Sequence, residues 1–361
     1  MGRLGISLYP EHSTLEQDMA YIKKAAECGF QRIFTCLISA EGDVADIKKR
    51  YKETNEYAKK HGMEVIFDIA PPVFDKFNVP HSDLTPFYEM GANGIRLDED
   101  LPAPEEAMLT YNPYGLKVEI NASQATRHID YLLSYGANPD RIISCHNFYP
   151  QKFTALSLSH FKKCNAIMKE NNVPVATFIT SHNTDTFGPW PVNEGLCTLE
   201  MHRELPISLQ ARHLIAMGDT NDIIIGNCYA TDAELEALSQ LKDGKLTFTL
   251  NLNDDITEVE KEIIYDFPHF VRGDMGDYMA RSTFSRITYA NHTIKPHDTR
   301  DLKRGDVVIL NEEYGRYKGE LHIVLEDMKN DGNKNVVGTL PIEEHILLDY
   351  LNPWRPFKFV R

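Results

Sequence analysis

The stretches RLGISLYPE (3–11), RIFTCLISA (32–40) and MEVIFDIAPP (63–72) are short and apolar, and each precedes a segment with helical periodicity. Five more stretches repeat this pattern: ANGIRLDED (92–100), LKVEINAS (116–123), RIISCHNFYP (141–150), VPVATFITSH (173–182) and DIIIGNCYA (222–230). Eight strand–helix units within about 240 residues match the size of a (β/α)₈ barrel. The sequence therefore predicts an α/β fold whose N-terminal domain is such a barrel.

Helix boundaries follow ordinary capping rules. Ser13 followed by Glu16 has the spacing of a capping box, so we expect the first helix to begin there. The first two helical patterns stop at Gly29 and Gly62, the residue type that most readily ends a helix. A further helix is expected over 123–136.

The alternation of strand and helix patterns ends at about Lys245. Short β-type stretches then follow one another without intervening helices: LTFTLNLN, RSTFSRITYA, GDVVILNE, GELHIVLEDM, NVVGTLP and PFKFVR. This pattern is typical of a small β-rich domain, with EVEKEIIYDF as one short helix inside it. We therefore divide the chain into a catalytic barrel, 1–244, and a β-rich domain, 245–361.

Composition narrows the function classes. The chain has 361 residues and a formal charge of −15, which argues against nucleic acid or an anionic membrane surface as a partner. The sequence has no apolar run of the length that spans a membrane and no apolar leader, so we expect a cytoplasmic protein. Six scattered cysteines without a CxxC pair indicate reduced thiols. Formation of a homo-oligomer is left open.

A barrel carries its chemistry at the C-terminal ends of its strands, where inward side chains alternate. The carboxylates expected there are Asp68, Asp98 and Glu119 on three consecutive strands, with Glu11 at the lip of the first strand. The other polar strand-end residues are Tyr9, Arg96, Asn121, His146, Asn147, Tyr149, Ser181, His182, Asn227 and Tyr229.

Three interpretations of the acidic residues compete. Two carboxylates on neighbouring strands can reach the separation of about 5–10 Å that glycoside hydrolysis uses. Alternatively, Asp68, Asp98, Glu119 and His146 bind a divalent metal. In the third interpretation the charges are structural and Arg96 pairs with its acidic neighbours.

Other candidates carry weaker signals. Trp190 in GPWP can stack on a sugar face or pack against its own loop. Arg272 and Arg281 in VRGDMGDYMARST suit phosphate or carboxylate, or form ion pairs in a turn. His128 and His213 are expected on helix surfaces or in loops.

Several segments, taken together, are characteristic of one protein family. They are GISLYPEHST, RIFTCL, PYGLK, CHNFYPQKFT, FITSH, GPWP, GLCTLEMHR, IIIGNCYA, RGDMGDYMARST and YKGELHIVL. With them the chain closely resembles, over essentially its whole length, a bacterial family associated with 6-phospho-N-acetylmuramidases, whose members often carry the label "outer surface protein". The resemblance implies a (β/α)₈ barrel followed by a cyclophilin-like β domain.

The resemblance also implies a substrate. It would be a phosphorylated amino-sugar disaccharide, cleaved at the β-1,4 bond between N-acetylmuramic acid 6-phosphate and N-acetylglucosamine during cytoplasmic recycling of the cell wall. Its phosphate and lactyl carboxylate need cationic or amide donors, for which we consider Arg96, Arg272 and Arg281. Backbone amides near Ser181–Asn183 and Gly226–Asn227 are the expected phosphate site. Asn121, Asn147 and His146 would then hold hydroxyl or acetamido groups.

From strand position we expect a glycosidase that needs no metal or cofactor. Glu119 is assigned as general acid/base and Asp98 as nucleophile or base, with Asp68 and then Glu11 as substitutes. Two alternatives stay open: a metal-dependent sugar-phosphate isomerase, epimerase or aldolase, and a non-catalytic protein that binds muropeptide sugars. Retention or inversion, and nucleophilic participation of the acetamido group, are also open. The C-terminal domain is expected to cap the barrel.

Overall fold

A computed structural model describes residues 2–360 of the chain. It separates into two compact units. The first comprises the chain up to Leu214 together with Gly218–Lys242, and the second comprises Ile215–Met217 with the chain from Asp243 onward. Each unit has its own sheets and its own core.

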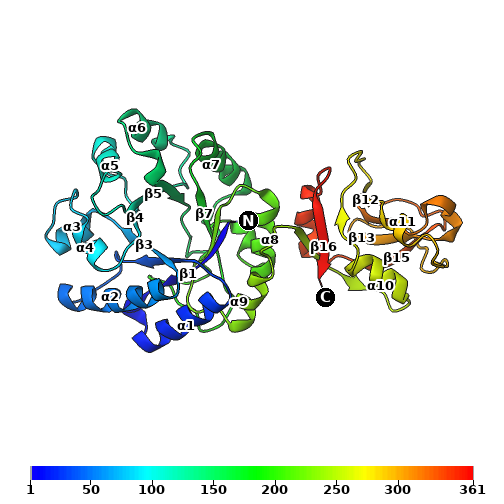
Figure 1. The fold of residues 1–361 in the computed structure, drawn as a ribbon, viewed down its shortest axis with the longest axis horizontal. Coiled ribbons are helices and arrows are strands. Elements are labelled where there is room, and N and C mark those ends of the chain that lie inside the picture. Colours follow the sequence, from blue (N-terminus) through cyan, green and yellow to red (C-terminus); the bar gives the residue numbers. More distant parts are fainter. Residues whose placement is uncertain (1, 361) are drawn as a thin grey trace. The chain divides into compact units, whose positions relative to one another are not determined.

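The first unit is a closed barrel of parallel strands in the order β1 to β8, in which β1 also pairs with β8 (Figure 1). The strands are β1 (Arg3–Leu8), β2 (Arg32–Cys36), β3 (Glu64–Ile69), β4 (Gly94–Leu97), β5 (Lys117–Asn121), β6 (Ile142–Cys145), β7 (Val175–Ile179) and β8 (Asp222–Ile225). The predicted (β/α)₈ barrel is confirmed.

Helices surround the barrel (Figure 1). They are α1 (Leu15–Glu27), α2 (Val44–Lys60), α3 (Pro71–Phe77), α4 (Thr85–Glu89), α5 (Ala103–Leu109), α6 (His128–Ser134), α7 (Leu158–Glu170), α8 (Ile207–Met217) and α9 (Asp232–Ser239). Short 3₁₀ turns are η1 (Pro10–His12), η2 (Pro139–Arg141) and η3 (Glu200–His202). The apolar faces of the helices pack on the outer face of the strands. For example, Phe87 of α4 packs against Phe67 of β3, and Phe74 of α3 packs against Phe87.

Some helix boundaries differ from the sequence-based ones. The capping box of α1 is Thr14 with Gln17, one residue beyond the predicted pair, because the Ser13 hydroxyl lies 2.9 Å from Asp18 Oδ1 instead. Gly29 follows α1 with a φ of +80°, as a helix stop requires. Helix α6 begins only at His128, although a start near residue 123 was expected.

Strand tilt sets the height of each interior side chain in the barrel. The strand register pairs Asp68 with Arg96, and Arg96 with Glu119. In a (β/α)₈ barrel the shear of about 8 lowers register partners by about one residue per strand along the barrel axis. Glu119 therefore lies below Asp68, and the β5 residue nearest the height of Asp68 is Asn121.

Charged side chains fill the N-terminal end of the barrel. Arg3 Nη2 lies 2.6 Å from Asp222 Oδ2, and a second nitrogen of Arg3 pairs with Glu64. Lys117 Nζ lies 2.7 Å from Glu64 Oε1. The network thus joins strands β1, β3, β5 and β8 through alternating charges.

Arg32 extends this network into the interior. Its side chain is 1% exposed, and it donates to Asp222 Oδ2 at 2.6 Å and to Glu119. Burial opposes ionisation of Asp222, but Arg3 and Arg32 outweigh it and hold the pKa of Asp222 below its usual value. This stabilisation is therefore present above the ordinary aspartate pKa and is lost as pH falls through the lowered one.

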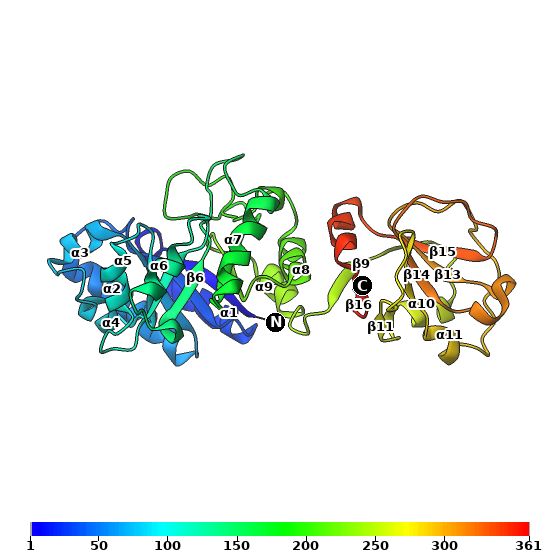
Figure 2. The same cartoon turned by 90° about the horizontal axis from the view of Figure 1, so that it is seen from above.

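The second unit is built mainly of antiparallel strands. Its sheets have the orders β10-β15-β13-β14-β12 and β11-β16-β9, and Figure 2 shows β13, β14 and β15 side by side. The strands are β9 (Leu246–Thr249), β10 (Asn251–Leu252), β11 (His269–Phe270), β12 (Met279–Ser282), β13 (Asp306–Leu310), β14 (Leu321–Val324), β15 (Lys334–Thr339) and β16 (Pro356–Val360). Val308, Val324 and Val336 lie in its core.

Its helices are α10 (Glu258–Tyr265) and α11 (Ser285–Thr288), with 3₁₀ turns η4 (Glu312–Tyr317) and η5 (Ile342–Tyr350). The predicted β-rich character and the helix at α10 are confirmed. The strand predicted from RSTFSRITYA is wrong beyond Ser282, because a helical turn starts at Ser285, whose hydroxyl donates to Gly319 O at 2.6 Å.

Across the described residues, no helix combines the length and the apolar character that a membrane span requires.

The buried Arg32 network leads to a stability prediction. Replacing Arg32 by Met leaves Glu119 buried without its cation, so we expect a loss of about 3–5 kcal/mol in the free energy of unfolding. The matched control is Arg127→Met, because Arg127 is 51% exposed and pairs with Asp130 on the surface. That change is expected to cost less than about 1 kcal/mol. Urea unfolding measures both, and equal losses would contradict the importance of the buried network.

Candidate active site

A cavity of ≈ 170 Å³ opens at the C-terminal ends of strands β2, β3, β4, β6 and β7. Its lining residues are Phe34, Ile38, Asp68, Arg96, Asp98, Asn147, Phe148, Pro150, Phe178 and Trp190. Asp68, Arg96, Asp98, Asn147 and Trp190 were predicted from the sequence, and the structure brings them together. A larger cavity of ≈ 630 Å³ lies beside α5 on the helical exterior, and its lining is mostly apolar. Of these two cavities, only the strand-end cavity is lined by both carboxylates and a guanidinium.

Arg96 forms hydrogen bonds to three other residues that line the cavity. Its side chain is 3% exposed, and Nη1 donates to Asp68 and, at 2.9 Å, to Asp98 Oδ1. Nη2 donates to Asn147 Oδ1. Burial opposes the charge of Arg96, but the two carboxylates outweigh it and raise its pKa well above the usual value. Arg96 is therefore a fixed cation that orients both acids.

Asp68 and Asp98 lie in different environments. Asp68 is 6% exposed, and burial raises its pKa to about 6 although Arg96 acts in the opposite direction. The nearby charge of Asp98 adds to the increase. The Asp98 side chain is 43% exposed. One carboxyl group thus keeps its proton to a higher pH than an ordinary aspartate, while its neighbour faces solvent.

Aromatic rings form the walls of the cavity. Phe34 and Phe178 meet edge to face with centroids 5.1 Å apart, and Phe148 contacts both rings. Sequence reasoning missed these residues because apolar strand residues are usually core. Cys36 is the register partner of the interior residue Asp68, and Phe34 lies two residues before it, so strand alternation places Phe34 on the interior face as well. Trp190 is 41% exposed at the rim.

Glu119 faces the barrel interior but not the cavity. It is fully buried, its Oε1 accepts from Arg32, and its Oε2 has no hydrogen-bond partner. The predicted position assumed that Asp68, Asp98 and Glu119 are level, whereas strand tilt places Glu119 in a lower layer. This placement does not support Glu119 as the general acid.

His146 points away from the cavity, into the helix layer. Its Nε2 lies 2.7 Å from Asn165 Oδ1 on α7, and burial lowers its pKa to about 4. Its neighbour Asn147 has the opposite strand parity and faces Arg96. Asn121 Oδ1 accepts from Ser123 N at 2.8 Å, so it caps its own turn.

Several backbone amides of the expected phosphate site already donate to protein groups. Ser181 N donates to Asn227 Oδ1 at 2.8 Å, and Asn227 Nδ2 donates to Ser181 O at 2.9 Å. His182 N donates to Glu234 Oε1 at 3.3 Å, and Gly226 N donates to Ile179 O at 2.8 Å. A side-chain carboxylate and an amide therefore take the positions in which a phosphate would bind these backbone donors.

The predicted tyrosines are held by other contacts. Tyr9 is fully buried and its hydroxyl donates to Gly226 O at 2.5 Å, while the Tyr229 hydroxyl donates to Asp18 Oδ1 at 2.7 Å. Tyr149 is half-buried and pairs through its backbone with Cys197. Through these contacts the three tyrosines stabilise the structure at the strand ends.

Glu11 belongs to a second, smaller group. Its carboxylate accepts from Ser39, and its Oε2 lies 3.0 Å from the Tyr51 hydroxyl. It lines a separate cavity of ≈ 260 Å³ between η1 and α2. Glu11 is thus not among the residues that surround Arg96.

Arg272 and Arg281 lie in the second unit, where both contact Asp274. Arg272 Nε pairs with the Asp274 carboxylate, and Arg281 Nη2 donates to Asp274 O at 2.8 Å. These contacts are the ion pairs in a turn that the sequence left open as an alternative. His213, expected on a surface, is buried, and its Nδ1 lies 2.8 Å from His202 Nε2.

The geometry also argues against the alternative in which Asp68, Asp98, Glu119 and His146 bind a divalent metal. Of its four proposed ligands, Glu119 lies in the lower layer and His146 faces the helices. The remaining pair, Asp68 and Asp98, already shares the guanidinium of Arg96. This arrangement does not fit a divalent ion at these four residues.

Comparisons with known proteins agree with the two-part fold. The family model described as 6-phospho-N-acetylmuramidase, N-terminal, matches residues 4–240, and the C-terminal model of the same enzyme matches residues 246–360. No curated relative matches the chain.

Two solved structures are similar over the full length. A protein from B. cereus is 48% identical with a TM-score of 0.92, and the match covers 100% of this chain and 99% of that chain. A conserved protein from Enterococcus faecalis is 25% identical with a TM-score of 0.75, and the match covers 99% and 96% of the two chains. The chain therefore belongs to the 6-phospho-N-acetylmuramidase family and is a glycosidase.

Proposed function

We propose that this glycosidase cleaves the β-1,4 bond between N-acetylmuramic acid 6-phosphate and N-acetylglucosamine by carboxylate chemistry at Asp68 and Asp98. The observation that carries the proposal is the pairing of both carboxylates with Arg96 inside an apolar-walled cavity at the strand ends. The biological setting would be recycling of peptidoglycan fragments in the cytoplasm.

Asp68 takes the role of general acid that the sequence assigned to Glu119. A buried carboxyl group with a pKa of about 6 keeps a proton at a pH where an exposed aspartate has lost it. It can protonate the glycosidic oxygen as the bond to the leaving N-acetylglucosamine breaks. The low polarity of the Phe34 and Phe178 walls maintains this pKa.

Asp98 acts on the opposite face of the sugar as nucleophile, or as the base that activates water. Its exposed carboxylate can approach the anomeric carbon, and Arg96 fixes one of its oxygens. Positive charge that develops at the anomeric carbon in the oxocarbenium-like transition state is stabilised by this carboxylate.

The cavity accommodates part of the substrate. Its ≈ 170 Å³ is below the range of about 300–1,000 Å³ that is usual for ligand pockets, so the second ring would extend past Trp190. Arg96 is committed to the two acids, and recognition of the phosphate then requires further donors. A role of Arg272 and Arg281 in binding the phosphate stays a prediction.

The first test replaces each carboxylate by its amide. Asp68→Asn and Asp98→Asn are expected to lower kcat by at least about 10²-fold, because each removes one half of the acid–nucleophile pair. Turnover of the phosphorylated muramyl disaccharide, followed by mass spectrometry, measures this.

Glu119→Gln is the matched control, expected to lose stability but to keep kcat within about tenfold in its folded fraction. If Glu119→Gln were the most damaging change to kcat while the fold persists, the assignment would return to Glu119. If none of the three variants affected turnover, the carboxylate mechanism itself would be wrong.

The second test uses pH. A general acid must be protonated to act, so we expect kcat to decline as pH rises through about 6, the pKa of Asp68. The measurement uses saturating substrate, because a phosphate monoester also titrates near pH 6 and would affect kcat/KM. A kcat that instead rises between pH 5 and pH 8 would contradict this role.

The third test concerns stereochemistry. Asp68 and Asp98 each accept a hydrogen bond from Arg96 Nη1. Their two accepting oxygens therefore lie no more than roughly 6 Å apart. That is closer to the spacing of about 5–5.5 Å found in retaining enzymes than to the about 6.5–9.5 Å of inverting ones. Proton NMR during early turnover is expected to show the β anomer of the muramic acid product first. Initial release of the α anomer would contradict the short separation.

A further inference from the structure

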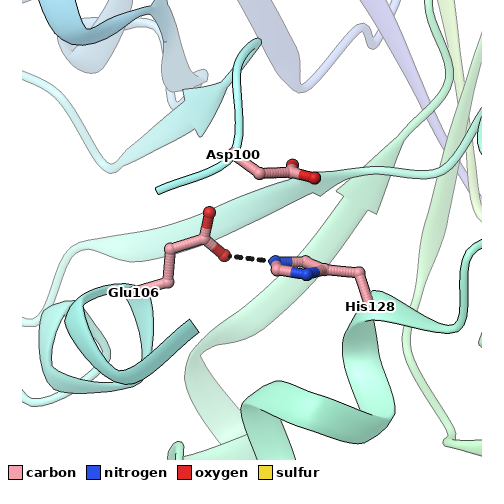
Figure 3. A group of neighbouring side chains, drawn as sticks. All are labelled: Asp100, Glu106 and His128. Atoms are coloured by element: carbon pink, nitrogen blue, oxygen red, sulfur yellow. Dashed lines mark hydrogen bonds and ion pairs between the residues drawn. The ribbon is translucent and has the colours of Figure 1, made fainter. Parts of the chain in front are cut away.

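Outside the cavity, three side chains from separate segments converge on one point (Figure 3). Asp100 lies in the loop after β4, Glu106 lies on α5, and His128 is the first residue of α6. Each offers one ligand atom, and these atoms all lie within 4.8 Å of one another. Among the described residues, this is the group of His, Cys, Asp and Glu side chains with the spacing of a metal site.

The group is oriented by its own surroundings. The Glu106 side chain has no exposed surface, and its Oε1 accepts from Leu101 N at 2.7 Å. Its Oε2 lies 2.7 Å from His128 Nε2, as the dashed line in Figure 3 marks. Carboxylates that bind metals are commonly fixed in this way by a hydrogen bond to the oxygen that does not bind.

The segment that carries Asp100 and Glu106 has an excess of negative charge. Residues 97–116 contain five acidic residues and neither lysine nor arginine. The nearby Arg127 pairs with Asp130 and Glu170. A buried carboxylate is costly without a compensating cation, and the ion-pair partner of Glu106 in the described structure is an imidazole, which is charged only when protonated.

We propose that Asp100, Glu106 and His128 bind one divalent transition-metal ion, with Zn²⁺ or Mn²⁺ as the class of ion. The ion would replace the proton between His128 Nε2 and Glu106 Oε2, and that proton passes to solvent. One imidazole nitrogen with two carboxylates suits Zn²⁺ and Mn²⁺, whereas Ca²⁺ and Mg²⁺ prefer oxygen ligands throughout. Water completes the coordination from the exposed side.

The observed spacing is close to that of a filled site. Ligands at about 2.1 Å from a tetrahedral ion lie about 3.4 Å from one another, so the His128–Glu106 contact would open by roughly 0.7 Å and the most distant ligand atoms would close by at most roughly 1.4 Å. Asp100 is exposed, so its side chain is free to make this movement and leaves an entry path for the ion. The hydrogen bond from Leu101 N to Glu106 Oε1 need not change.

The bound ion would link the β4–α5 loop to α6 and so act as a structural staple. Asp98 lies two residues before Asp100 in that loop, and the ion takes no part in the chemistry proposed for the cavity. The site is therefore independent of the proposed glycosidase mechanism, and its test does not use turnover.

The test counts ions on the full-length protein. After removal of metals with a chelator, the protein is dialysed against Zn²⁺ or, separately, Mn²⁺, and bound metal is measured by mass spectrometry. We expect one tight equivalent per chain, an increase in Tm on binding, and at least a tenfold weaker affinity in both Asp100→Asn and His128→Gln.

His81→Gln is the matched control, because His81 Nδ1 also faces a carboxylate, Glu105 Oε2, at 3.7 Å but lacks a third ligand. It is expected to bind like the unchanged protein. Asp100 is exposed, so Asp100→Asn keeps the fold, and circular dichroism of the metal-free variants checks this. Absence of a stoichiometric ion, or tight binding that persists in both ligand variants, would overturn the proposal and leave an ordinary His128–Glu106 ion pair.

Discussion

Closure of the parallel barrel is the constraint on which the other features depend. β8 must return to pair with β1, and eight tilted strands can close only with a stagger between neighbours. That stagger places Asp68, Arg96 and Glu119 at successively lower heights although they are register partners. The same closure brings Asp222 beside Arg3 and so assembles the charged layer at the opposite end.

The two ends of the barrel use ion pairs for different purposes. At the N-terminal end, Arg32 is enclosed by Glu119 and Asp222, and each charge is compensated inside the protein. At the C-terminal end, Arg96 holds two carboxylates in unequal environments, one buried and one exposed to solvent. In the mechanism that we propose, this unequal burial around a shared cation separates the acid from the nucleophile, so the same type of interaction would stabilise one end and prepare the other for chemistry.

Several backbone amides after β7 and β8 already donate to acceptors within the protein, and this bears on how the substrate is recognised. In many barrels such backbone donors bind phosphate. Here Asn227 and Glu234 accept hydrogen bonds from Ser181 N and His182 N, so we expect other groups to contribute to recognition of the substrate's anionic group. The chain keeps the barrel architecture of its family, while its own side chains accept hydrogen bonds from amides that bind phosphate in other barrels.

The sequence by itself determined the number and order of the barrel strands, the β-rich nature of the second unit, and five of the residues that line the cavity. Apolar stretches, glycine stops and strand parity are local signals, and they survive folding because each depends on one segment. Only the tertiary structure decided that Glu119 lies below the cavity, that His146 faces α7, and that Asp100, Glu106 and His128 meet. Those outcomes depend on strand tilt, on the neighbours each side chain finds and on the packing of helices from separate segments, and none of these is encoded in the spacing of residues along one strand.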